Sequence, residues 1–247
     1  MKIAAVSAPF RNGKTRENTG IMIRWIEAAA KQGADLVLFG ESALQGFDGL
    51  FWELEKDLYI AVQQTGSEIQ KISECAKENG IYVSFGYFEQ ADGNIYSSQI
   101  VIDDMGTVVS NFRRVSAGWK VPECQDPAYR EGDSFFTFDI MKKRTAIALC
   151  GDLWYEKRMD EMKALKPELV LWPVYCDYDA EEWNEKVKYE YLEQASRLNV
   201  PVVLVSPYCD EDELAVCSKG SCVHFENGCI VKEIPSGKPG MMIAEIN

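Results

Sequence analysis

The chain has 247 residues, of which 26 are Lys or Arg and 39 are Asp or Glu, so its formal net charge is −13. This acidic balance argues against nucleic acid as a partner, because each phosphate contact needs a cation. With 47% apolar and 26% charged residues, and without a run of roughly 18 uncharged apolar residues, the composition is that of a packed domain, which excludes a disordered chain and a membrane span.

The amino terminus and the cysteines favour a reducing compartment. Residues 1–6 lack the apolar stretch and cleavage site of a secretory signal, so we expect a cytosolic protein with reduced thiols. The eight cysteines include no Cys-x-x-Cys pair and the only histidine is His224, so we expect no structural zinc site.

Taken in chain order, the first half predicts strands and helices in alternation, then consecutive strands. Residues 3–8 are a short apolar run, residues 17–31 repeat apolar side chains at helical spacing, and residues 36–39 are a buried strand. Residues 58–77 are predicted to form a second helix, and strands follow at 81–88, 96–102 and 107–112. The order is β-α-β-α-β-β-β.

The same order returns after residue 144. It comprises a strand at 145–149, a helix near 157–165, a strand at 169–172, a helix at 182–198, and strands at 200–205, 221–225 and 229–234. Local sequence similarity between the two halves supports the match, since Gly-Ala-Asp-Leu-Val-Leu-Phe-Gly at 33–40 resembles Lys-Pro-Glu-Leu-Val-Leu-Trp-Pro at 166–173.

Two matching halves predict a four-layer α-β-β-α sandwich. A strand such as 200–205 is apolar on both faces, so helices cover one face of each sheet and the sheet of the other half covers the second. We therefore expect one α/β domain over residues 1–247, built from two βαβαβββ halves. Two independent domains are the alternative, but residues 118–134 lack the composition of a flexible linker.

Polar side chains stand where predicted strands end, which is where ligands collect in α/β sheets. Glu41 follows the strand at 36–39, Cys150 follows the strand at 145–149, and Arg113-Arg114, with Lys120 six residues on, follows the strand at 107–112. Each has an ordinary structural explanation alone. Together, a thiol nucleophile, a carboxylate base and a cation for a developing oxyanion suit acyl transfer.

These residues resemble the nitrilase superfamily of carbon-nitrogen hydrolases, whose Glu-Lys-Cys triad occurs in this order. The resemblance extends from Ile-Ala-Ala-Val at 3–6, through Leu-Val-Leu-Phe-Gly-Glu at 36–41, to Leu-Cys-Gly-Asp at 149–152 and Glu-Asn-Gly at 226–228. It implies the four-layer fold, hydrolysis of a non-peptide carbon-nitrogen bond in a small molecule, no cofactor or metal, and a homodimer or larger homo-oligomer.

The chain departs from the family pattern at the cation and after the nucleophile. The usual Tyr-Arg-Lys becomes Phe-Arg-Arg at 112–114, and the usual Cys-Tyr-Asp becomes Cys-Gly-Asp at 150–152. Strict alignment puts Arg114 at the lysine position. We nevertheless favour Lys120, because a guanidinium is bulkier than an ammonium and Gly118 would let the loop turn back toward Cys150. Glu123 or Glu131 would then be the second glutamate that orients the lysine.

The resemblance implies a mechanism in which Glu41 takes the thiol proton and Cys150 attacks the substrate carbon. Lys120 and the backbone N–H of Gly151 would hold the oxyanion. Aromatic residues near the strand ends either wall the pocket or pack the core, and these are Phe47, Trp119, Trp154 and Tyr175.

The motif residues leave the substrate open among amides, nitriles and N-carbamoyl compounds, with an amide preferred. Arg114 could bind one substrate carboxylate. The altered lysine motif also leaves room for a non-catalytic interaction protein that keeps the fold. Alkylation of Cys150 in preference to the other cysteines would separate an enzyme from such a scaffold.

Overall fold

Apolar residues that alternate or run continuously along the chain build two β-sheets in the computed structural model, which describes residues 1–209 and 217–247. The first sheet has the strand order β13-β1-β3-β4-β5-β6. Its strands are β1 (Lys2–Ser7), β3 (Leu36–Phe39), β4 (Tyr82–Ala91), β5 (Asn94–Ile102), β6 (Val108–Arg113) and β13 (Gly240–Glu245). Strands β1, β3 and β4 are parallel, so their carboxyl ends share one edge.

The second sheet repeats this plan in the order β12-β11-β10-β9-β8-β7. Its strands are β7 (Thr137–Ile140), β8 (Lys143–Ile147), β9 (Leu169–Pro173), β10 (Val202–Cys209), β11 (Lys219–Glu226) and β12 (Cys229–Ile234), with the short β2 (Pro9–Phe10) paired to β10. Strands β8, β9 and β10 are parallel and correspond to β1, β3 and β4 of the first sheet.

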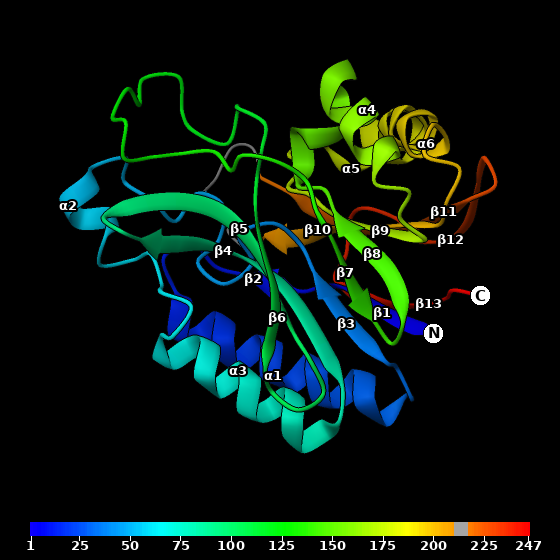
Figure 1. Ribbon diagram of the computed structural model, residues 1–247, viewed down its shortest axis with the longest axis horizontal. Helices are drawn as coiled ribbons and strands as arrows, with labels where there is room; N and C mark the ends of the chain where they lie inside the picture. Colours follow the sequence, from blue (N-terminus) through cyan, green and yellow to red (C-terminus); the bar gives the residue numbers. More distant parts are fainter. Residues whose placement is uncertain (210–216) are drawn as a thin grey trace.

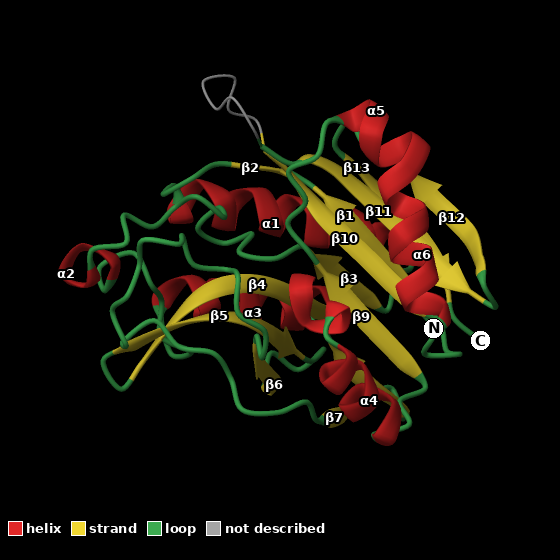
Figure 2. Ribbon diagram, turned by 90° about the horizontal axis from the view of Figure 1, so that it is seen from above, coloured by secondary structure: helices red, strands yellow, loops and turns green. Residues whose placement is uncertain are grey.

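Helices cover the outer face of each sheet. On the first sheet lie α1 (Thr15–Lys31) and α3 (Ser67–Asn79), and on the second lie α4 (Glu156–Ala164), α5 (Ala180–Glu182), the π-helix η2 (Trp183–Val187) and α6 (Lys188–Ser196). Figure 1 shows α1 and α3 on one side of the molecule and α4 and α6 on the other, and Figure 2 shows the same layers from above. The four-layer α-β-β-α arrangement is therefore confirmed.

Two buried cores separate the layers. Between the sheets, Leu36 and Leu38 of the first sheet pack with apolar residues of the second such as Leu171. On the opposite face of the first sheet, Val37 and Phe39 pack against α1 and α3. Successive residues of β3 thus serve different cores, as the two-residue period of a strand requires. This double burial explains why the strand is apolar throughout.

The predicted helix over residues 58–77 is wrong in its first turns. Helix α3 begins at Ser67, directly after the N-cap residue Gly66. A short helix, α2 (Leu54–Asp57), lies further upstream, and Val62 forms a β-bridge with Glu89. The Tyr129 hydroxyl donates to the buried carboxylate of Asp57, and Val62 exchanges backbone hydrogen bonds with Phe88 and Gln90 of β4. These tertiary bonds override the helical periodicity of the segment.

Three short strands fall outside the predicted elements. Strands β2 and β7 lie beside longer strands, and β13 crosses to the first sheet, where it pairs antiparallel with β1. The backbone N–H of Ile246 donates to Met1 O, so the chain ends close to where it starts, as Figure 1 shows. Pairing between residues more than 200 positions apart has no local sequence signal.

Candidate active site

Glu41 is a buried carboxylate held at the end of β3. Its backbone N–H donates to Val174 O of the other sheet (3.3 Å), and its side chain has no exposed surface. Oε1 accepts hydrogen bonds from Ser97 Oγ (3.1 Å) and from Arg114 Nη1 (3.0 Å). Oε2 is also buried and has no hydrogen-bond partner among the described residues. One oxygen is therefore fixed and the other is available to a proton donor.

Cys150 lies on a tight turn after β8, at the first residue of the 3₁₀ helix η1 (Cys150–Trp154). Its φ of 42° is in the left-handed region, which an L-residue adopts only when its surroundings enforce it. The carbonyl O of Cys150 accepts the indole N–H of Trp172 (2.9 Å), and its thiol Sγ donates to Tyr175 O at 3.7 Å. The turn thus places the sulfur beside the end of β9.

The thiol is protonated at neutral pH in this resting structure. Burial, followed by the negative charge of Glu41, raises the pKa of Cys150 to about 12, although the positive charge of Arg114 acts in the opposite direction. A base is therefore needed to form the thiolate, and Glu41 is the carboxylate whose charge acts most strongly on this thiol.

Arg114 supplies the buried cation of the site. Its guanidinium donates from Nε to Ser116 Oγ (3.0 Å), from Nη1 to Glu41 and from Nη2 to Ala117 O (3.4 Å). The residue is only 3% exposed, and its charge interacts with Glu41, Cys150 and Asp152. Despite burial, the negative charges of Glu41 and Asp152 raise the pKa of Arg114 above its ordinary value, so it stays charged.

The predicted placement of Lys120 beside Cys150 is not what the structure shows. Lys120 Nζ donates to Tyr129 O (3.0 Å) and forms an ion pair with Glu131 Oε1 (2.8 Å). Gly118 does turn with a positive φ of 97°, as expected. However, Trp119 is buried against Trp52 in a separate aromatic cluster, so the loop is anchored there and carries the ammonium to Glu131.

The other residues that the sequence predicted for the site differ in exposure and in packing partners. Glu123 is exposed, so Glu131 is the glutamate that pairs with Lys120. Trp154 is 40% exposed and packs against Tyr191 on the helical side of the second sheet. Tyr175 stacks on Phe47, with ring centroids 4.2 Å apart and an interplanar angle of 6°.

Tyr175 and Phe47 close a narrow space beside Glu41. The hydroxyl of Tyr175 donates to Asp48 Oδ2 (3.2 Å) and accepts the backbone N–H of Ser218. The cavity that Glu41, Phe47 and Tyr175 line has a volume of only about 10 Å³. A bound molecule must therefore be very small, or the stacked pair must move.

The buried carboxylate of Asp152 ties the Arg114 loop to the Cys150 turn. Oδ2 accepts Leu149 N–H (2.8 Å), and Oδ1 accepts Ser116 N–H (2.8 Å) and Val115 N–H (3.2 Å). The sequence pattern showed that this Asp is kept but gave it no role. Ser97 and Ser116 also had no role predicted from the sequence, because a serine that orients a buried ion pair has no motif of its own.

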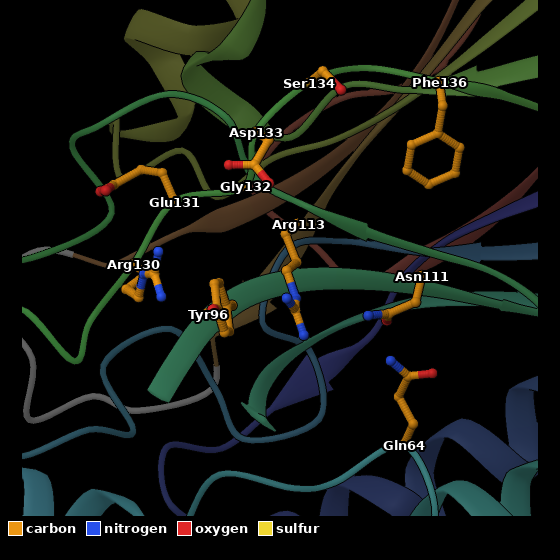
Figure 3. Close-up of a pocket in the computed structure, with 10 residues that line it drawn as sticks. All are labelled: Gln64, Tyr96, Asn111, Arg113, Arg130, Glu131, Gly132, Asp133, Ser134 and Phe136. Carbon is orange, nitrogen blue, oxygen red and sulfur yellow. The ribbon is translucent and has the colours of Figure 1, made fainter. Parts of the chain in front are cut away.

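Arg113, the neighbour of Arg114, points to the opposite face of β6. Its Nε and Nη2 donate to Glu89 (2.8 and 2.9 Å), and its guanidinium stacks on Tyr96 at 3.8 Å. Figure 3 shows Arg113 with Tyr96 and Asn111 in a separate polar cavity of about 320 Å³. The strand pleat thus divides the arginine pair between two sites, and only Arg114 reaches Glu41.

No group of three or more Asp, Glu, His and Cys side chains suited to a metal ion occurs in residues 1–209 and 217–247. Over the same residues, no helix is both long and apolar enough to span a bilayer.

The chain is thus an α/β protein with a four-layer sandwich fold, and it carries a thiol, a carboxylate and a guanidinium at the ends of its strands. Residues 2–247 match the model of the carbon-nitrogen hydrolase family, and the chain belongs to this family.

Curated relatives carry several names. The chain is similar to a cyanide hydratase of Penicillium rubens (31% identity over 190 residues, 70% of this chain and 51% of the relative). It is also similar to an arylacetone-specific nitrilase of Alcaligenes faecalis (29% identity, 62% of this chain and 44% of the relative). The chain spans about half the length of the curated relatives that it matches.

Solved structures of low sequence identity share the fold. An amidase from Nesterenkonia sp. AN1 superposes with a TM-score of 0.81 at 16% identity, covering 100% of this chain and 93% of that chain. A glutamine-dependent NAD⁺ synthetase from Acinetobacter baumannii gives a TM-score of 0.80 at 23% identity, covering 98% of this chain and 44% of that chain.

Proposed function

We propose that this protein hydrolyses the amide bond of a small uncharged molecule through a thioester on Cys150. The observation that carries the proposal is the convergence of three side chains from different strand ends, since Arg114 bonds Glu41 and both charges act on the Cys150 thiol. Membership of the carbon-nitrogen hydrolase family supports the reaction class.

In the proposed reaction, Oε2 of Glu41 takes the thiol proton as the Cys150 sulfur bonds to the substrate carbonyl carbon. The carbonyl oxygen becomes an oxyanion, which the guanidinium of Arg114 and the backbone N–H of Gly151 stabilise. Collapse of this intermediate breaks the carbon-nitrogen bond, and Glu41 returns the proton to the departing ammonia. Glu41 then deprotonates a water molecule that cleaves the thioester, and Cys150 recovers its proton.

Arginine can fill the cation role in this scheme because the step needs a fixed charge and not a proton. Glu41 performs both proton transfers, and Arg114 only offsets negative charge on sulfur and oxygen. A guanidinium is charged at every pH at which the protein is folded.

The narrow space beside Glu41 favours a short acyl group. Phe47 and Tyr175 close it with a neutral aromatic wall and leave about 10 Å³, room for about one water molecule. Even formamide or acetamide needs the rings to move, and a short acyl group needs the smallest movement. Among the described residues that line this space there is no Lys or Arg, and Arg114 is engaged with Glu41, which favours an uncharged substrate.

Hydrolysis or hydration of a nitrile is the second candidate, because two of the relatives are cyanide hydratases and a linear nitrile is slimmer than an amide. An N-carbamoyl substrate is a further option, given the similarity to an N-carbamoylputrescine amidase of Solanum tuberosum. Both would use the same thiol.

Ammonia release from formamide, acetamide, butyramide, a carbamoyl compound, cyanide and acetonitrile tests the proposal, with product analysis for the nitriles. We expect the short amides to be cleaved fastest, wild-type protein to gain an acyl mass on Cys150, and Cys150→Ala to be inactive. Activity that survives Cys150→Ala contradicts the thioester. Absence of turnover across the panel, with Cys150 no more reactive than the other cysteines, favours the non-catalytic scaffold.

We also propose that the protein acts in the cytosol, because the mechanism needs a reduced thiol.

We propose further that the protein forms a homodimer or larger assembly. Exposed aromatic side chains on the second half are candidates for the contact, and these are Trp154, Tyr155 and Tyr189. Light scattering at two protein concentrations would show a monomer if this is wrong.

A further inference from the structure

The guanidinium of Arg114 lies directly against the main chain of Gly151. A Cβ atom added at residue 151 would sit 2.7 Å from Arg114 Nη2, 3.8 Å from Arg114 Cζ and 3.3 Å from Ser116 Oγ. Contacts under 3.0 Å essentially never occur for a real Cβ, so any side chain at this position would push the guanidinium away. The guanidinium of Arg114 thus occupies the space that a side chain at residue 151 would need.

The backbone itself does not require a glycine here. Cys150 adopts a positive φ of 42°, whereas Gly151 is absent from the glycines with positive φ. An alanine could therefore follow the same main-chain path without strain. What the glycine provides at residue 151 is volume, and Arg114 occupies that volume.

We propose that Gly151 is a positioning residue whose missing side chain admits an arginine to the site, so that a guanidinium and not an ammonium stands beside Glu41 and Cys150. The pairing of residues 114 and 151 concerns geometry alone. Only its consequence for turnover rests on the proposed hydrolysis.

The contact makes a specific prediction about what a larger residue disturbs. The atom that a Cβ would strike is the far end of a long side chain, so the fold can yield by moving the guanidinium. That movement weakens the bond between Nη1 and Glu41 and withdraws positive charge from Cys150. Site chemistry should therefore change more than overall stability.

A different explanation is that Gly151 only lets a substrate approach the main chain. In that case Gly151→Ala would act in the same way whatever residue occupies position 114. A lysine at position 114 is slimmer and has no Nη2, so the Arg114→Lys variant should tolerate an alanine at position 151. The two explanations thus differ in whether the effects of the two positions are coupled.

The test uses four proteins: wild type, Gly151→Ala, Arg114→Lys and the double variant. Gly20→Ala is the matched control, because a Cβ there lies at an ordinary 3.8 Å from Arg24 Nη1. Alkylation of Cys150 by iodoacetamide is followed by peptide mass spectrometry from pH 6 to 10, and thermal unfolding is recorded for each protein.

In the arginine background, we expect Gly151→Ala to slow alkylation at pH 8 by roughly tenfold, because loss of a nearby opposite charge moves a pKa by about one unit or more. In the lysine background the same substitution should change the rate by less than about twofold, as should Gly20→Ala in wild type. Equal slowing in both backgrounds overturns the proposal, and so does no slowing in either.

If Gly151→Ala does not fold, the double variant decides. Recovery of folding when Arg114→Lys is added supports the proposal, and failure to recover overturns it. Amide hydrolysis is measured on the same samples. If alkylation shows that positions 114 and 151 are coupled but wild type releases no ammonia, the proposed function is wrong and the inference about Gly151 still holds.

Discussion

Arg114 Nη1 lies 3.0 Å from Glu41 Oε1, and both side chains are buried, at 4% and no exposure. The two charges act on the Cys150 thiol in opposite directions, since Glu41 raises the pKa of the thiol and Arg114 lowers it. Burial, with the charge of Glu41, therefore keeps the sulfur protonated at rest, and the Glu41 carboxylate is in place to remove the proton. Removal of one charge at a time should therefore change the reactivity of the Cys150 thiol in opposite directions.

We expect Glu41→Gln to make Cys150 more reactive toward iodoacetamide while abolishing hydrolysis. Without the carboxylate charge, the pKa of Cys150 falls and the thiolate fraction at pH 8 rises, by roughly tenfold if the pKa moves one unit. Turnover is lost because no base remains. Alkylation rates at pH 8 beside ammonia release check both halves, and a variant with slowed alkylation would contradict the assigned signs.

Arg114→Met should slow alkylation of Cys150 and destabilise the fold. The substitution leaves Glu41 buried without its cation, which typically lowers the free energy of unfolding by about 3–5 kcal/mol. Urea unfolding measures the loss.

Lys120→Met is the control for the cation. Its ion pair with Glu131 is partly exposed, at 23% and 30%, so its removal should change the free energy of unfolding by only about 0–1 kcal/mol. Turnover should persist in Lys120→Met and vanish in Arg114→Met. The reverse pattern would restore the lysine assignment that the sequence favoured.

Chain-order reasoning located two of the three central groups because their positions follow from strand ends. Glu41 and Cys150 stand where parallel strands of the two sheets finish, and that geometry is local. The cation depended on the path of the loop after Arg114. Burial of Trp119 and the charge on Glu131 decide that path, and both are tertiary contacts that periodicity does not report.

The fold was predictable to the same extent. The strands that carry the two cores have continuous or alternating apolar residues, and that pattern places them within a few positions of their ends. Strand β13 was not found, because its pairing with β1 joins the two ends of the chain. The start of α3 was misplaced because Val62 of the preceding segment bonds to the backbone of β4, a tertiary contact that periodicity does not report.

Asp152 should make stability depend on pH in weakly acidic solution. Burial raises the pKa of its carboxyl from 3.8 to about 6, although backbone N–H groups and Arg114 favour its charged form. The folded state thus holds a proton more tightly than the unfolded chain. The resulting stabilisation is present below about pH 4 and disappears as pH rises through about 6, with a size of about 3 kcal/mol.

Asp152→Asn tests this contribution, because asparagine does not titrate. The difference in the free energy of unfolding between wild type and variant should shift against wild type from pH 4 to pH 7. A difference that stays constant over that range would show that the carboxyl keeps an ordinary pKa. At all pH values the variant places an NH₂ group near N–H donors that now bond Oδ1 and Oδ2, which should itself destabilise the turn by about 1–3 kcal/mol.

Phe47→Ala should widen access to Cys150. Phe47 stacks on Tyr175, whose carbonyl O accepts the Cys150 thiol, and both rings line the narrow space beside Glu41. Removal of one ring should increase the rate of labelling by the bulky reagent N-ethylmaleimide more than the rate by iodoacetamide, and should shift amide preference from acetamide toward butyramide. Tyr59→Ala is the control, because Tyr59 is 93% exposed. An unchanged ratio of the two labelling rates would show that substrate enters by another route.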